Sequence, residues 1–187
     1  NNVNSYKKDN LFVFLNLSFQ FEHKIDWNFM YNKKLWNYNL NYFDFLNQEN
    51  ISAKEGFLLI NDFSSNYTKI KFGKDSYPTS LRLINIIKFI SKHKIYDNNV
   101  LNLVFSDTVR LKKNLEFHLL ANHLLENVFA LFFASVFLND RRLLEKSQNI
   151  IIKQLNEQIL DDGAHFELSP MYHKIILIKL LDILHLI

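Results

Sequence analysis

The segment 114–138 constrains the fold most, because its second half is almost continuously apolar. Apolar residues there recur at three- and four-residue steps, which predicts a helix buried on nearly every side. Four polar residues, the polar quartet Asn122, His123, Glu126 and Asn127, interrupt this background. Helix positions three or four apart share one side, so the quartet gathers there. Because buried polar groups are costly unless hydrogen-bonded, the quartet predicts either a structural network or a site.

Composition favours a helical protein of one domain. The 187 residues include 18 Phe and 8 Tyr but only 3 Gly and 2 Pro, which suits long helices and disfavours an all-β fold. The net charge of +3 is too scattered to predict nucleic-acid binding, although it is compatible with an anionic ligand. The absence of cysteine excludes disulfides and thiolate metal ligands.

The sequence shows no membrane span. No apolar run reaches the roughly 18 residues that a span needs, because Glu126 and Asn127 interrupt the best candidate. No signal peptide is visible. The chain opens on Asn1 and stops at Ile187 within an amphipathic pattern, so we expect a fragment with sequence missing at both ends.

Helical patterns follow one another at the rhythm of antiparallel helical pairs. After a loose start at residues 1–10, the segment 11–21 alternates and is aromatic, which predicts a short strand or an extended arm. We expect helices over residues 35–46, 57–67, about 79–91, 100–117, the second half of 114–138, 140–160, and from 170 onward.

Two early helices carry candidate ligand contacts. Between residues 35 and 46, Tyr38 and Tyr42 alternate with asparagines expected on the surface, and aromatic rings beside amides suit sugar rings. The alternative is that these residues only solvate a helix. Arg82 falls in a first helical turn, where the helix dipole disfavours a cation. It is expected either to grip a carboxylate bidentately or to form a surface ion pair.

A short non-helical segment before Pro170 carries His165 and Glu167. Pro170 opens the final helix, and Tyr172 and His173 fall in its first turn. Loops and helix starts often place side chains at the mouth of a cleft. Taken singly, each residue has an ordinary alternative as a loop histidine or an aromatic anchor.

Two long motifs carry a family resemblance. The first is Asn114-Leu-Glu-x-His-Leu-Leu-x-Asn-His-Leu-Leu-Glu-Asn127, and the second is Asp162-Gly-x-His-Phe-Glu-x-Ser-Pro-Met-Tyr-His173. Together they resemble the N-terminal domain of the heparinase II/III-like polysaccharide lyases. The shorter segments 35–44 and 77–82 fit the same family, so the resemblance covers nearly the whole chain from about Phe12.

The resemblance implies an all-α fold, an incomplete (α/α) toroid of antiparallel helical hairpins with a short extended N-terminal arm. Residues 1–187 are expected to be a single partial domain. The family's later toroid helices and its large β-sandwich domain are expected elsewhere in the parent chain. Since the cleft of these lyases lies between toroid and sandwich, this piece is expected to be inactive alone. A periplasmic or cell-envelope location follows from the same resemblance.

The implied activity is β-elimination on an acidic polysaccharide that contains uronic acid. Such a lyase removes the C5 proton of the uronate and expels the 4-linked oxygen, so donors must stabilise charge beside a carboxylate. No cofactor and no metal are expected, since the histidines and isolated carboxylates make no convincing metal set. By resemblance, the catalytic positions are Asn122, His123, Glu126 and Tyr172. The candidate substrate-binding residues are Arg82, Tyr38, Tyr42, Asn127 and His173.

Each catalytic position suits a step of that chemistry. Asn122 offers an amide donor, and His123 is a donor or a base. Burial would raise the pKa of Glu126 and keep it protonated as a donor. A tyrosine side chain has a reference pKa of about 10 and carries its proton at neutral pH, so this residue type at position 172 suits the acid that protonates the leaving oxygen. The Tyr172 hydroxyl is therefore expected to point into the concavity that the quartet lines, with Arg82 and the two tyrosines at its flanks.

Two other functional classes are open. A non-enzymatic scaffold or glycan-binding module would have its polar quartet satisfied internally, with no cleft beside it. A glycoside hydrolase on a similar toroid needs two carboxylates across the scissile bond, and Glu126 with Glu167 or Asp162 are the candidates. The sequence favours elimination, because Asn-His-x-x-Glu and Tyr-His fit that chemistry better.

Overall fold

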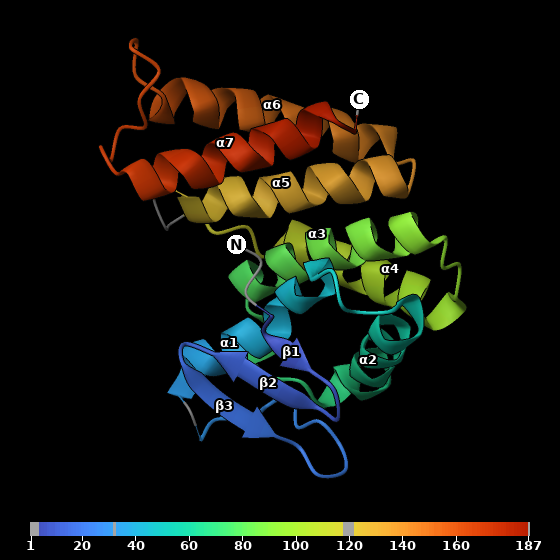
Figure 1. Ribbon diagram of the computed structural model, residues 1–187. Coiled ribbons are helices and arrows are strands. Elements are labelled where there is room, and N and C mark those ends of the chain that lie inside the picture. The colour runs from blue at the N-terminus through green and yellow to red at the C-terminus, as the bar shows by residue number, and fades with distance from the viewer. Residues whose placement is uncertain (1–3, 32, 118–121, 187) are drawn as a thin grey trace. The chain divides into compact units, whose positions relative to one another are not determined.

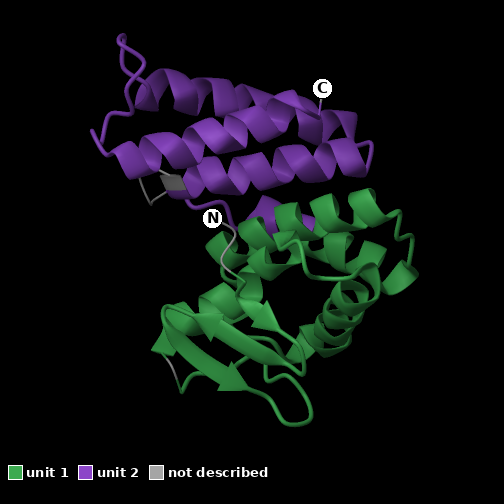
Figure 2. Cartoon of the chain, viewed as in Figure 1, with its two compact units in different colours: residues 1–107 green, residues 108–187 purple. Residues whose placement is uncertain are grey.

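The computed structural model describes residues 4–31, 33–117 and 122–186 (Figure 1). The chain forms two compact units, residues 1–107 and residues 108–187 (Figure 2). The boundary falls inside helix α4 (Asn98–Lys113), so no change of composition or loop marks it in the sequence. The expected single partial domain stays a prediction.

Unit 1 begins with a small antiparallel sheet of β1 (Tyr6–Lys7), β2 (Leu11–Phe14) and β3 (Leu17–Gln20), in that order. Phe12 pairs with Tyr6 on one side and Phe19 on the other, and its side chain is buried. The predicted strand in 11–21 is therefore a hairpin. Residues 1–10, predicted to be loose, contain β1, because Tyr6 packs its ring 5.1 Å from that of Phe12.

The helices of unit 1 are α1 (Lys33–Tyr42), α2 (Ala53–Asn66), α3 (Ser76–His93) and the first part of α4. Three short 3₁₀ turns, Asp44–Asn47, Tyr67–Lys69 and Phe72–Lys74, connect them. Helix α2 starts four residues earlier than expected, because Ser52 and Glu55 form a capping box before its apolar stripe begins.

The core of unit 1 is aromatic. The rings of Trp27 and Phe43 stack with centroids 5.2 Å apart, and Phe63 meets both edge-on. The expectation that the asparagines of α1 lie on the surface is wrong. Asn37 and Asn41 are fully buried, and both side-chain amides donate to the backbone carbonyl of Trp27. The two asparagines thus join α1 to the segment before it. The alternation of tyrosines and asparagines in the sequence could not reveal these contacts.

Unit 2 contains the end of α4 and then α5 (Asn122–Phe137), α6 (Arg141–Gln158) and α7 (Pro170–Leu184). Helix α5 packs against α6 and against α7. Helix α6 runs antiparallel to α5, and α7 runs in the same direction as α5 (Figure 1). Every residue of 124–135 is buried, as the apolar pattern predicted. Asp140 caps α6 by accepting from the Leu143 backbone N–H at 3.0 Å.

The expected all-α fold with a short extended N-terminal arm is confirmed. The helix expected over 100–117 ends at Lys113, so residues 114–117 form a non-helical approach to α5. In the described part of the chain, no helix is long and apolar enough to cross a membrane. Closure of these hairpins into a toroid stays a prediction.

Candidate active site

The polar quartet lies at the start of α5, the central helix of unit 2. Asn122 is the first residue of the helix, and its side chain lies outside the described structure. The His123 side chain is 40% exposed, whereas Glu126 and Asn127 are buried. One end of a buried helix therefore presents a partly exposed imidazole next to a buried carboxylate.

Asn127 binds the non-helical segment that leads into α5. Its side-chain oxygen accepts from the Glu116 backbone N–H at 3.0 Å, and its amide donates to the Glu116 carboxylate at 3.1 Å. The Asn127 side chain has no exposed surface. The expected substrate contact through Asn127 is therefore not available in this structure, and the residue instead fixes the approach to the helix.

Replacing Asn127 by alanine is expected to lower the free energy of unfolding by about 2 kcal/mol. The change removes two hydrogen bonds and leaves the backbone N–H of Glu116 in a partly buried place without its acceptor. Chemical denaturation of both proteins measures the difference. Asn156→Ala, at an exposed position of α6, is the matched control and should change stability by less than about 0.5 kcal/mol.

The same carboxylate of Glu116 lies beside His123. Its Oε2 atom is 3.5 Å from the Nδ1 atom of the imidazole, and the glutamate side chain is only 15% exposed. A carboxylate at Nδ1 orients an imidazole and favours the tautomer whose Nε2 accepts a proton. Glu116 was not singled out from the sequence, although it stands within the first long motif.

Glu126 faces a cation that sequence analysis also missed. The Nζ atom of Lys179, on α7, lies 3.4 Å from the Glu126 Oε2 atom, with the two side chains 16% and 3% exposed. Burial raises the pKa of Glu126, and the charge of Lys179 opposes that effect. The direction is the one expected from the sequence, but the lysine makes the ionised form less costly.

A pocket of about 620 Å³ lies at the loop between α6 and α7. His165 is buried beneath it, donating from Nε2 to the Gln158 side-chain oxygen at 3.2 Å while Nδ1 accepts from the Glu167 backbone N–H. Burial lowers the pKa of His165, which favours this neutral form. The lining residues are Asp162, Gly163, Ala164, His165, Leu168, Ser169, Pro170 and His173.

Tyr172 and His173 stand at the start of α7, as the sequence predicted. His173 is exposed and lines the loop pocket, whereas Tyr172 is half-buried with its ring centroid 6.4 Å from that of His165. Tyr172 and Lys179 are seven residues apart, so they share one face of α7. Whether the Tyr172 hydroxyl points at His123 and Glu126 stays a prediction.

The expected role of Arg82 as a substrate contact needs correction. Its guanidinium group binds Asp107 bidentately, with Nε donating to Oδ2 at 2.8 Å and Nη2 to Oδ1 at 2.9 Å. It also donates to the backbone carbonyl of Gly73 at 2.6 Å, and the side chain is 0% exposed. Arg82 does grip a carboxylate, but the carboxylate belongs to the core of unit 1.

Tyr38 and Tyr42 belong to an aromatic group on unit 1. The Tyr38 hydroxyl donates to the Asp75 carboxylate, and the Tyr42 ring lies 6.0 Å from that of Tyr77. Lys34 lies over the Tyr38 ring at 5.0 Å. Both tyrosines remain partly exposed, and their contact with substrate stays a prediction because they lie in the other unit from the quartet.

The described residues contain no group of three or more His, Asp or Glu side chains placed to hold a metal ion. Unit 2 presents three polar features: an imidazole with a carboxylate 3.5 Å from Nδ1, a buried carboxyl group beside an ammonium group, and a tyrosine at a helix start. These features define a helical domain with a polar site at one end of its central helix.

The chain belongs to the family described as heparinase II/III N-terminus, whose family model matches residues 86–187. That match spans more than half of the chain and includes α5, the loop pocket and α7. All four expected catalytic positions fall inside it, whereas Tyr38, Tyr42 and Arg82 fall outside. No curated protein and no solved structure matches the chain.

Proposed function

We propose that the protein is a polysaccharide lyase that cleaves uronic-acid-containing glycans by β-elimination. The observation that carries the proposal is the composition of the site within the matched family region. His123, paired with Glu116, adjoins the buried Glu126 on one helix, and Tyr172 starts the helix that packs beside it. A substrate of this kind fits a periplasmic or cell-envelope location.

In the proposed reaction, a base takes the C5 proton of the uronate, the C4–O bond breaks, and a C4–C5 double bond forms. Glu116 at Nδ1 supports His123 as that base, because it stabilises the imidazolium that results. The departing oxygen takes its proton from Tyr172. Asn122 and a protonated Glu126 donate to the uronate carboxylate, where negative charge accumulates.

The scaffold alternative is supported by part of the same geometry. Asn127 and Glu116 satisfy each other, and Glu126 is paired with Lys179. A catalytic site also needs a group that substrate can reach, and His123 is 40% exposed beside the Glu116 carboxylate. The hydrolase alternative pairs the buried Glu126 with the exposed Glu167 or Asp162.

The natural full-length protein is expected to release products with an unsaturated end from uronate glycans. The new double bond conjugates with the uronate carboxylate and absorbs in the near ultraviolet, so absorbance follows the reaction directly. A neutral glycan with the same linkage is the control and should give no signal. Products that gain reducing ends without that absorbance would instead support the hydrolase alternative.

A further inference from the structure

The lysine that faces Glu126 is unusual for its surroundings. Lys179 stands in a helix of isoleucines and leucines, and its side chain is 16% exposed. A largely buried ammonium group is costly unless a partner of opposite charge compensates it. Its partner is the 3%-exposed carboxylate of Glu126, 3.4 Å away on the neighbouring helix. The pair is thus placed inside the site that the proposed function uses.

We propose that Lys179 is a positioning residue of this site, which orients Glu126 and supplies the positive charge that a uronate carboxylate needs beside it. The proposal rests on the proposed function and adds the feature that selects acidic sugars. It also makes Lys179 responsible for the pH at which Glu126 takes up the proton that it would donate.

The first argument is electrostatic. The charged groups that act on Glu126 are Lys179 and Asp182 from α7 and His123 from α5. Burial raises the pKa of Glu126, and Lys179 gives the strongest opposing effect. An anionic sugar placed beside an ionised Glu126 would be repelled, whereas beside the pair it meets a net charge near zero. Removing the ammonium group takes away that positive charge and lets the pKa of Glu126 rise further, so the anionic sugar loses its electrostatic attraction to this place.

The second argument is geometric. Residues seven apart on a helix lie within about 20° of one face and about 10 Å along the axis. The face of α7 that brings Lys179 to α5 is therefore the face that carries Tyr172. An ion pair between the helices restrains the rotation of α7 about its axis, so it also restrains the side of the helix on which Tyr172 lies. Lys179 thus links two of the proposed catalytic positions.

The test compares Lys179→Met, Lys179→Gln and Lys179→Arg in the natural full-length protein. For a uronate glycan, KM should rise about tenfold or more in the first two variants, with a smaller change in kcat, because a lost charge-assisted contact is worth at least that factor. Lys179→Arg should restore KM to within about threefold. Lys174→Met, at an exposed position of the same helix, is the matched control and should behave as the wild type.

A second readout does not depend on activity. Carbon-13 NMR of labelled glutamate carboxyl groups, assigned by the signal lost in Glu126→Gln, follows the protonation of Glu126. In Lys179→Met its titration should move to higher pH. Because a raised folded-state pKa favours the native state as pH falls, the stability lost in this variant should be largest at neutral pH. It should shrink as pH falls towards the ordinary glutamate value of about 4.3.

The outcomes separate the two proposals. Unchanged KM and an unchanged Glu126 titration in Lys179→Met and Lys179→Gln would overturn the role of Lys179 while leaving the lyase intact. A wild-type protein that produces no unsaturated product would overturn the lyase instead, and the NMR titration would still decide whether Lys179 governs Glu126. If Lys179→Met fails to fold, the titration and KM of Lys179→Gln decide the same question.

Discussion

Replacing Arg82 by methionine is expected to lower the free energy of unfolding by about 3–5 kcal/mol, the largest stability effect of any single change that we predict. The substitution keeps an unbranched apolar stem but removes the guanidinium group, so it leaves the carboxylate of Asp107 buried without its cation. It also removes the donor to Gly73 and the guanidinium group that lies 4.6 Å from the Phe63 ring. Denaturant unfolding of the two proteins measures the loss.

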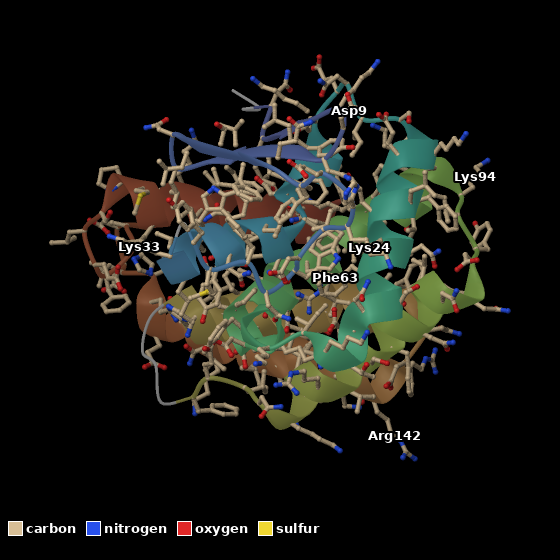
Figure 3. All side chains as sticks on the ribbon, turned by 90° about the horizontal axis from the view of Figure 1, so that it is seen from below. Asp9, Lys24, Lys33, Phe63, Lys94 and Arg142 are labelled. Carbon is tan, nitrogen blue, oxygen red and sulfur yellow. The ribbon has the colours of Figure 1, made fainter. Side chains whose placement is uncertain are left out.

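Two further variants make that result specific. In Arg82→Met/Asp107→Leu, no charge is left unpaired, so the double variant should be more stable than Arg82→Met alone. Arg142→Met is the control, because Arg142 is exposed at the start of α6 and its side chain extends outward in Figure 3. It should change stability by less than about 0.5 kcal/mol. If Arg82→Met lowers the free energy of unfolding only slightly, the Arg82–Asp107 pair contributes little to stability.

Arg82 illustrates what a sequence can and cannot predict about a charged residue. The sequence left open a bidentate grip on a carboxylate and a surface ion pair, and the structure has the first. The helical-turn argument itself was wrong, because α3 begins at Ser76 and Arg82 lies in its second turn. The identity of that carboxylate depends on packing, since Asp107 lies 25 residues further along the chain, on α4. Helical periodicity describes one helix at a time. It therefore could not distinguish a substrate carboxylate from one supplied by the core.

The same limit explains the site residues that were missed. Lys179 looks like an interruption of an apolar helix, and only the packing of α7 on α5 brings it to Glu126. Glu116 was counted in a motif but assigned to a helix that in fact ends at Lys113. By contrast, the burial of α5 and the position of Tyr172 were predictable. Both follow from local patterns, a closely spaced apolar run and a proline at a helix start.

Removing the Tyr172 hydroxyl is expected to cause the largest loss of activity. Tyr172→Phe in the natural full-length protein should lower kcat/KM for a uronate glycan by about 100- to 10,000-fold, the usual contribution of a positioned acid or base. The free energy of unfolding should change by less than about 1 kcal/mol, because phenylalanine keeps the ring beside His165 in a half-buried place. Initial rates of near-ultraviolet absorbance and denaturant unfolding measure the two effects.

The contrast between these two effects decides whether Tyr172 acts on substrate. If its hydroxyl delivers the proton to the leaving oxygen, glycans with a better leaving group should be cleaved by Tyr172→Phe with less loss, because their departing oxygen needs less protonation. If Tyr172 is only an aromatic anchor, the loss does not depend on the leaving group. The variant would then have a lower free energy of unfolding, or it would cleave all substrates more slowly by the same factor. Tyr96→Phe, at a position that is 77% exposed in unit 1, should leave both measurements unchanged. Full activity in Tyr172→Phe would remove the tyrosine from the mechanism and make His123 the first candidate for both proton transfers.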